Sequence, residues 1–511
     1  MSAPNLHLRF RPSRTSSIIP GVPSLCLIVV SVVVLASTST GTPVRSGSIP
    51  SLARVGVSGP RAASIQVGQS PWGVAFDSVN RFVYVSNFGS GTVSAINTST
   101  DQVVTSIPVP VLNGYGNGPI AVNAATGVVY VGDGVGTVYG IDPATNKVGW
   151  TISLASYGCP YGCGADVQTY DPANGDIYVT NIVTNNVTVI HETTVVATIP
   201  VGVGPNGAAY DATNGEIFVS NEGSTIPANL TVISGTTNRV VGQVYPSGNG
   251  PGVTYDSSNG YIYACTNGVQ GNFSNVVSVA NGTTNKVVTV IPISSSCGAA
   301  VYDPANGYVY VTDRNMPGGR DATTVTLIDP STNRVVSTQP VQLGPIGIAY
   351  DPVNHNLYVA NGDSATVSVL PQIYRLTVRE TGLPSGTNWS ATVEGTTFSS
   401  TTPSIPFPET NGTFNFTVAN ATNRSACPAS GSVTVAGGPS DLNVTFPTST
   451  CGASSKGLFG LPGETGYYLL GGLVALLVAA TAVMVVLTRR KRKAKPSLTT
   501  SPPDGAPGQD R

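Results

Sequence analysis

Charged residues are scarce in this chain of 511 residues, where Asp, Glu, Lys and Arg together make up 10%. Ordinary soluble proteins contain roughly 25%. So few charges argue against a nucleic-acid-binding protein and against a chain kept disordered by its own charge. Glycine is plentiful, with 59 residues, but it has no triplet period, which excludes collagen. What remains is a turn-rich, β-rich protein with apolar segments.

Histidine is scarcer still, with only His7, His191 and His355 in the whole chain. A metal site built on a histidine cluster is therefore impossible. His191 and Glu192 do not belong to an H-E-x-x-H pattern, because Val195 stands where the second histidine would be. No phosphate-binding loop or dinucleotide-binding glycine motif is present either. We therefore predict no catalytic residue, no metal ligand and no cofactor.

Long apolar runs are few and stand near the two ends. The first, Leu25–Leu35, spans only about 16 Å as a helix and follows a start with three arginines and no acid. A basic start, a short apolar core and small residues after it are typical of a secretory signal peptide, which we predict over residues 1–39. The alternative is an uncleaved N-terminal anchor, whose helix Pro20 and Pro23 would interrupt.

The second run, Tyr467–Leu487, has 21 residues without a charge and is long enough to cross a bilayer. Five basic residues follow at 489–493, and positive charge marks the cytoplasmic side. The sequence thus predicts a single transmembrane helix over 467–488 and a basic cytoplasmic tail over 489–511. The predicted location is the cell membrane, with a large extracellular N-terminal domain.

Six of the seven cysteines lie in the predicted extracellular part, and Cys26 lies in the signal peptide. An even number in an exported segment indicates disulfides, for which fifteen connectivities are possible. Proximity in the sequence favours the pairs Cys159–Cys163, Cys265–Cys297 and Cys427–Cys451. The alternative of zinc at the first pair lacks two further ligands nearby.

Asn-x-Ser/Thr sequons are frequent, and all of them lie between the two apolar runs. The eleven candidates for glycosylation are Asn97, Asn186, Asn229, Asn272, Asn281, Asn388, Asn411, Asn415, Asn420, Asn423 and Asn443. Four of them fall within the 13 residues 411–423. Glycans there would shield a segment close to the membrane, so we predict a glycoprotein.

A pattern of about 46 residues repeats seven times between residues 70 and 371. Each unit has four strand-like runs, and links such as D-P-A-N-G between the first two are typical of tight hairpins. One acid or amide ends the first run of every unit: Asp77, Asn123, Asp171, Asp211, Asp256, Asp303 and Asp351. Four strands per unit at this period predict a seven-bladed β-propeller over residues 62–371.

The ring needs one more strand to close, because the seventh unit ends after three runs at Leu370. The segment Ala63–Gly68, before the first unit, matches the fourth run of other units, such as Ala197–Gly202. We therefore expect the N-terminal strand to complete the last blade, which would remove the exposed edges of the sheets.

The third unit contains Tyr178-Val179-Thr180-Asn181, and close variants stand at 84–87, 310–313 and 358–361. With the T-V-S/T-V-I and T-N-x-V-V segments that follow, these motifs resemble the YVTN-type β-propeller repeats of surface-layer-associated archaeal and bacterial proteins. The resemblance covers about 300 residues and departs from the pattern at Asn123, Gly132 and Cys265. It implies a propeller, and lactonase-like or lyase-like relatives imply a possible metal-dependent activity.

Residues 372–447 break the repeat and show alternating patterns at 375–378, 389–393, 414–418 and 442–446. In about 75 residues this predicts a small β-sandwich, followed by a linker over 448–466. The stretch Glu380–Trp389 resembles C-terminal modules of archaeal surface proteins, including thermopsin-type peptidases, without their catalytic residues.

Two polar positions recur in the units. The first is the acid or amide already named, which could form a carboxylate ring or serve its own hairpin. The second falls at one strand end per unit and could line a rim of the channel or cap a turn. Its members are Asn87, Asp133, Asn181, Asn221, Asn267, Asp313 and Asn361. Repetition in nearly every unit favours the structural role for both.

The sequence therefore predicts an all-β protein in which a seven-bladed propeller and a small β-sandwich precede a single C-terminal transmembrane helix. We expect a binding or structural role at the cell surface, with a surface protein or a glycan as the partner and no nucleic acid. The alternative is a metal-dependent hydrolase or lyase of the lactonase-like kind, which needs an acid cluster such as Asp133, Asp313 and Asp363. The low charge would suit an acidic exterior.

Overall fold

The computed structural model describes residues 62–109, 118–154, 164–223, 229–246, 250–266, 275–314, 322–448 and 451. The elements assigned there are β-strands, so the predicted all-β class is confirmed. The described part holds seven four-stranded antiparallel sheets from β1–β28 and two further sheets from β29–β35. It contains no helix that is both long enough and apolar enough to cross a membrane. The predicted signal peptide, transmembrane helix and tail lie outside the described residues.

Each repeat unit forms one sheet, which we call a blade. Blades 1 to 3 contain β2 (Pro71–Asp77), β3 (Phe82–Asn87), β4 (Thr92–Asn97) and β5 (Gln102–Pro108); β6 (Ile120–Val122), β7 (Val129–Gly132), β8 (Thr137–Asp142) and β9 (Lys147–Ser153); and β10 (Ala165–Tyr170), β11 (Asp176–Asn181), β12 (Asn186–His191) and β13 (Thr194–Pro200).

The next three blades repeat the order. Blades 4 to 6 contain β14 (Pro205–Asp211), β15 (Glu216–Asn221), β16 (Asn229–Ser234) and β17 (Arg239–Val244); β18 (Val253–Asp256), β19 (Tyr261–Thr266), β20 (Val276–Asn281) and β21 (Lys286–Pro292); and β22 (Cys297–Asp303), β23 (Tyr308–Asp313), β24 (Thr324–Asp329) and β25 (Arg334–Pro340).

Blade 7 joins the two ends of the repeat region. It contains β26 (Pro345–Tyr350), β27 (Leu357–Asn361) and β28 (Thr366–Leu370), and its outer strand is β1 (Ala63–Gln66). β1 pairs antiparallel with β28, with Ala63 opposite Val369 and Gln66 opposite Thr366. The expectation that the N-terminal strand completes the last blade is therefore confirmed.

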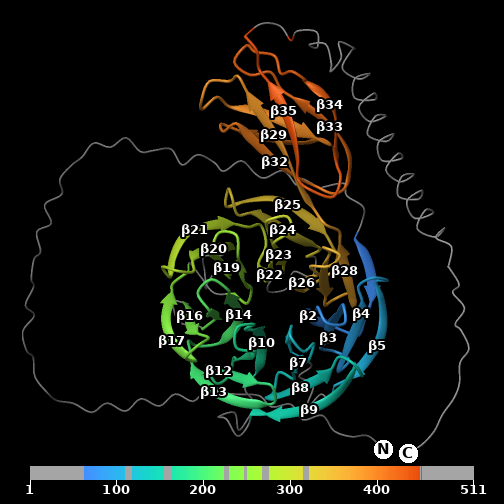
Figure 1. Ribbon diagram of the computed structural model, residues 1–511, viewed down its shortest axis with the longest axis vertical. Helices are drawn as coiled ribbons and strands as arrows, with labels where there is room; N and C mark the ends of the chain where they lie inside the picture. The colour runs from blue at the N-terminus through green and yellow to red at the C-terminus, as the bar shows by residue number, and fades with distance from the viewer. Residues whose placement is uncertain are drawn as a thin grey trace, which may run out of the picture. The chain divides into compact units, whose positions relative to one another are not determined.

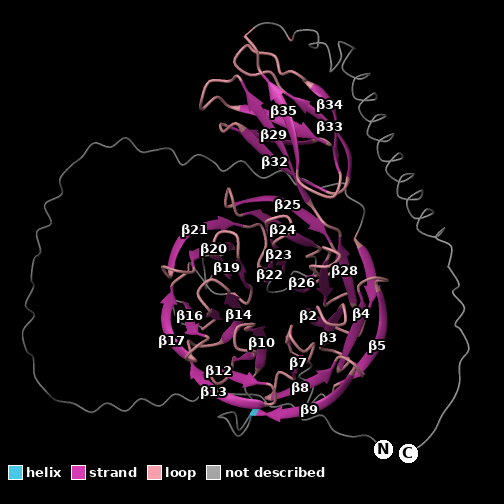
Figure 2. Cartoon of the chain, in the orientation of Figure 1, coloured by secondary structure: helices cyan, strands magenta, loops and turns pink. Residues whose placement is uncertain are grey.

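The first strands of the blades lie innermost and contact one another around a closed circuit, from β2 through β6, β10, β14, β18 and β22 to β26 and back to β2. Figure 1 shows them near the centre of a ring, with β5, β9, β13, β17, β21 and β25 outside. Figure 2 shows that strands make up nearly all of this ring. The arrangement is propeller-like.

The motif tyrosine links blades 1, 3, 5 and 7 to the blade that follows each of them. Tyr178 of β11 is fully buried, and its hydroxyl donates a hydrogen bond to Oδ1 of Asn238 at 2.7 Å, in the β16–β17 turn of blade 4. Asn238 has a φ of 53°, a left-handed conformation that asparagine tolerates better than most residues. Equivalent tyrosine bonds are Tyr84–Asn146, Tyr263–Asn333 and Tyr358–Asp101. The tyrosine and the T-N-x-V-V segment are thus two halves of one contact between blades.

Replacing Tyr178 by Phe is expected to lower the free energy of unfolding by about 1–2 kcal/mol, because the partly buried oxygen of Asn238 loses its donor. Thermal denaturation of the full chain measures the change. Tyr245→Phe is the matched control, since this tyrosine is 55% exposed and its hydroxyl bonds only to Gln243. Equal effects of the two substitutions would contradict the inter-blade role of the hydroxyl.

Close approach of the inner strands explains a recurring glycine. A Cβ on Gly347 of β26 would collide with the backbone carbonyl of Trp72 on β2, and one on Gly207 of β14 would collide with that of Pro251. Both glycines belong to the P-x-G sequence that opens a blade. The inner strands therefore leave no room for a side chain at this position. The backbone at Trp72 packs directly against β26 of blade 7.

Residues after the ring form two sheets on one core. The sheet β32-β29-β35 contains β29 (Tyr374–Thr381), β32 (Ser404–Glu409) and β35 (Ser440–Thr445); the sheet β31-β30-β33-β34 contains β30 (Trp389–Val393), β31 (Thr396–Ser400), β33 (Gly412–Val418) and β34 (Ser430–Val435). Buried Leu376, Val378 and Phe407 from the first sheet pack with Trp389 and Phe416 from the second. Two sheets that share a core are what a small β-sandwich requires.

Two of the three predicted disulfides are present. Cys265–Cys297 joins blade 5 to blade 6, and Cys427–Cys451 lies in the sandwich region. The predicted pair Cys159–Cys163 lies outside the described residues. The first disulfide therefore connects two repeat units, and the second closes a local loop.

Candidate functional site

The acid or amide that ends the first strand of each blade serves its own hairpin. Oδ1 of Asp77 accepts a hydrogen bond from the backbone N–H of Val79 at 2.8 Å, and Oδ1 of Asp171 accepts one from Ala173 at 2.8 Å. The same bond is made by Asn123, Asp211, Asp256, Asp303 and Asp351. These seven residues therefore stabilise turns and do not form a carboxylate ring.

The second polar series joins strands within a blade. Asn181 is fully buried, and its Nδ2 donates to Oδ1 of Asn186 at 2.7 Å and to Oγ1 of Thr188 at 2.9 Å, both on β12. Asn87, Asn221 and Asn361 make the same pair of contacts. In blade 6 the roles are reversed, since Asp313 accepts bonds from Thr324 and Thr326.

In blade 5, the residue that ends the second strand is not the one predicted. Position 267 was predicted as the strand-end residue, but it lies outside the described residues. Thr266 is the last residue of β19, and its hydroxyl donates to the carbonyl of Val276 at 2.8 Å. Counting ten residues from the anchor Asp256, as in the other units, identifies Thr266 from the sequence.

The acids required by the metal-dependent alternative act separately. Oδ1 of Asp133 accepts three backbone N–H bonds from Val135, Gly136 and Thr137 in its own turn. Asp313 bonds within blade 6, and Asp363 lies exposed after β27. No group of three His, Cys, Asp or Glu side chains gathers in the part of the chain that the structure describes.

The two histidines of the ring pair locally. Nδ1 of His191 lies 2.8 Å from Oδ1 of Asp176 on the neighbouring strand, with half of the histidine side chain exposed. Nδ1 of His355 lies 2.8 Å from the hydroxyl of Tyr350. Both histidines stand at the ends of hairpins, as the sequence predicts.

A different group of side chains gathers where the inner strands begin. The pairing of β2 with β3 shifts register between Pro71 and Val74, and that of β14 with β15 shifts between Pro205 and Gly207. Such β-bulges redirect side chains and are frequent near functional sites. Trp72 and Asn206 lie within these two bulges.

Arg314 follows β23 directly and contacts Trp72. Its guanidinium carbon lies 5.0 Å from the centre of the indole ring, which is cation–π geometry between blade 6 and blade 1. Phe88, at 37% exposure, extends the aromatic contact, with its ring centre 5.9 Å from that of Trp72. Burial lowers the pKa of Arg314, and the negative charges of Glu222 and Asp363 oppose that shift.

Glu222 brings a carboxylate toward this arginine from blade 4. It follows β15 at the position equivalent to Arg314, and it is half-buried. Burial raises its pKa, while a hydrogen bond from Asn206 and the charge of Arg314 act in the opposite direction. Trp72, Phe88, Glu222, Arg314 and Asp363 form what we call the strand-end cluster.

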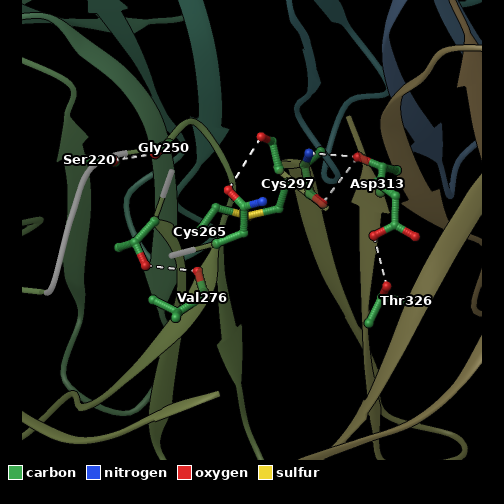
Figure 3. The surroundings of a disulfide bond; sticks show 12 residues. Ser220, Gly250, Cys265, Val276, Cys297, Asp313 and Thr326 are labelled. Carbon is green, nitrogen blue, oxygen red and sulfur yellow. Dashed lines mark hydrogen bonds between the residues drawn. A yellow bond between two sulfur atoms is a disulfide. The ribbon is translucent and has the colours of Figure 1, made fainter. Parts of the chain in front are cut away.

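The disulfide supports this end of the ring. Figure 3 shows Cys265 of β19 joined to Cys297 of β22. The backbone N–H of Arg314 bonds to the carbonyl of Ser296, the residue before Cys297. In other blades the residue at the position of Cys265 forms a hydrogen bond to the next blade through its hydroxyl. Ser220 donates to the carbonyl of Gly250, and Thr312 donates to the carbonyl of Ile346. The covalent link therefore fixes the segment that holds Arg314.

The strand-end cluster can hold a polar ligand. Among the described residues, the guanidinium of Arg314 has no hydrogen-bonding partner, and a guanidinium presents five N–H donors in a fixed fork. The carboxylates of Glu222 and Asp363 lie within electrostatic range of it. The set offers a fork for a carboxylate or carbonyl, acceptors for hydroxyl or amine groups, and an exposed aromatic ring.

Sequence comparison adds no relatives, because no family model and no curated protein matches the chain. Among solved structures, the hydrazine synthase of Kuenenia stuttgartiensis is similar, with a TM-score of 0.51 and 18% identity. The match covers 59% of this chain and 96% of that chain. At this identity the likeness bears on the fold alone, and it agrees with the propeller-like ring.

Proposed function

We propose that this chain is a membrane-anchored binding protein of the cell surface. In this proposal a seven-bladed propeller of the YVTN type carries the binding site, and the β-sandwich connects it to the transmembrane helix. The observation that carries the binding role is the contact of Arg314 with Trp72, with Glu222 nearby. The membrane anchor and the export signal rest on the sequence alone.

The placement of charge supports binding at this end of the ring. Only 10% of the residues are charged, yet three charged side chains and two aromatic rings from blades 1, 4, 6 and 7 meet in the strand-end cluster. A partly buried cation costs free energy unless it has a partner. A ligand that supplies acceptor oxygens to Arg314 would recover that cost.

The chemistry of the cluster favours a carboxylate-bearing glycan. The fork of an arginine matches the two oxygens of a carboxylate. Glu222 and Asn206 can accept and donate bonds to sugar hydroxyls, and an exposed ring such as that of Phe88 can pack on the apolar face of a sugar. A neutral ligand could accept hydrogen bonds from the arginine, but it would not form the stronger charge-assisted pair.

Arg314→Gln is expected to weaken binding to uronic-acid glycans at least tenfold, because the charged fork is lost. The measurement is binding of the detergent-solubilised full chain to an array that pairs each uronic-acid glycan with its neutral counterpart. Arg334→Gln is the matched control, since Arg334 is an exposed residue of β25 in the same blade. Equal binding by all three proteins, or no preference for the acidic glycans, would contradict the proposal.

A further inference from the structure

Two sequons of the ring and the six sequons of the sandwich differ in their structural surroundings. In the ring, Asn186 and Asn229 begin the third strands of blades 3 and 4, and both are partly buried. Oδ1 of Asn186 accepts a bond from Asn181 at 2.7 Å, and Oδ1 of Asn229 accepts one from Asn221 at 2.8 Å. Their sequon threonines, two residues on, accept a second bond from the same amides and are buried.

The sequons at Asn186 and Asn229 therefore arise from the blade pattern itself. Blades without an asparagine at this position place other residues there, as in T-V-S at 92–94, T-V-T at 324–326 and T-V-S at 366–368. In each of these blades the two polar side chains bond the strand-end residue of the neighbouring strand. Asn186 and Asn229 are thus structural, and a glycan on either would disrupt a buried set of hydrogen bonds.

The sandwich sequons differ in every respect. Their asparagine side chains are all exposed: Asn388, Asn411, Asn415, Asn420, Asn423 and Asn443. Asn415 points outward from β33, between inward-facing neighbours such as Phe416, and Asn443 points outward from β35 beside buried Val444. β33 and β35 belong to different sheets. Glycans here would cover both outer faces of the sandwich without breaking a core contact.

We propose that the six sandwich asparagines carry N-linked oligosaccharides, which form a glycan sheath, and that Asn186 and Asn229 in the ring remain unmodified. This rests on the proposed function, because glycosylation requires export. The sheath covers the sandwich, while the two ring positions with buried hydrogen bonds stay bare. The sandwich then acts as a shielded spacer.

The test is glycopeptide mass spectrometry on the full chain, produced in a host that exports and N-glycosylates proteins. Protease treatment of intact cells reports separately whether the chain is on the surface. We expect oligosaccharide on the sandwich peptides and none at Asn186 or Asn229. Replacing all six sandwich asparagines by Gln should remove the oligosaccharide from the sandwich peptides, while Asn186→Gln should leave the mass of the glycans unchanged and lower the Tm.

Two outcomes overturn the inference and one overturns the proposed function. Oligosaccharide at Asn186 or Asn229 contradicts the structural role of these residues. A chain that reaches the cell surface without modification of the sandwich contradicts the sheath but leaves the binding proposal intact. A chain that intact cells protect from protease contradicts export, and with it the proposed function.

Discussion

Removing the disulfide between Cys265 and Cys297 is expected to lower the free energy of unfolding by about 4 kcal/mol. The two cysteines are 32 residues apart, and closing a loop of that length restricts the unfolded chain by about this amount. For a ring of about 310 residues, a loss of this size corresponds to a fall in Tm of roughly 6 °C. Thermal denaturation of the full-length Cys265→Ala/Cys297→Ala variant measures it.

The repeat itself supplies a matched variant. Cys265 stands where blades 1 and 4 carry Ser86 and Ser220, and Cys297 stands where they carry Pro71 and Pro205. Cys265→Ser/Cys297→Pro therefore gives blade 5 and blade 6 the pattern of their neighbours. We expect it to lose less stability than the double alanine variant, because a serine hydroxyl can bond the next blade as Ser220 does.

The second disulfide provides the control for function. Cys427→Ala/Cys451→Ala opens a loop of 24 residues in the sandwich region, for a loss of about 3 kcal/mol. It should leave glycan binding by the ring unchanged. Loss of Cys265–Cys297 should weaken binding as well as stability, because Ser296 next to Cys297 holds the backbone of Arg314. Equal glycan binding by both double variants would show that the Cys265–Cys297 disulfide does not support binding at the strand-end cluster.

The architecture of the ring follows from its sequence because each contact is repeated. Tyr178 bonds Asn238 of the next blade, and the same two residue types recur in the pairs Tyr84–Asn146 and Tyr263–Asn333. A single short segment can be assigned wrongly from its sequence, but a pattern that recurs in seven units makes each strand assignment firmer. Closure could be predicted for the same reason, since Ala63–Gly68 matches a strand that the seventh unit lacks.

The strand-end cluster could not be predicted from the repeated pattern, because its residues differ from blade to blade. The residue eleven positions after each anchor varies: Phe88, Gly134, Ile182, Glu222, Asn267, Arg314 and Gly362. A motif search emphasises what recurs, so it favoured the anchors and strand ends, which are structural. Arg314 and Glu222 could have been identified in the sequence as the two charged residues at this variable position. Only the ring shows that blades 1, 4 and 6 bring these positions within reach of one another.

Acidification from pH 7.5 to pH 4.5 is expected to raise the Tm of the full chain. Burial raises the pKa of Asp313 to about 6, with the hydroxyls of Thr324 and Thr326 opposing the shift in part. A raised pKa means that the folded state binds the proton more tightly than the unfolded state, so this group destabilises the fold above pH 6 and ceases to do so as the pH falls toward 4. Burial likewise raises the pKa of Glu409 in the sandwich to about 7, with a smaller contribution from the charge of Glu394.

The size of the effect can be assigned to one residue. Asp313 is 1% exposed, and a shift of about two units corresponds to on the order of 3 kcal/mol. Asp313→Asn gives blade 6 the residue that blades 1, 3, 4 and 7 carry, and its amide can donate to Thr324 and Thr326 as Asn87 donates to Thr92 and Ser94.

The variant should therefore be more stable than the natural chain at pH 7.5 and similar to it at pH 4.5, with a flatter dependence of Tm on pH. Paired melting curves at the two pH values decide the matter. A natural chain that loses stability on acidification, or an Asn variant without advantage at pH 7.5, would contradict the assignment to Asp313. If the assignment holds, the carboxylate of Asp313 makes the ring more stable in an acidic exterior, which the low charge of the chain also favours.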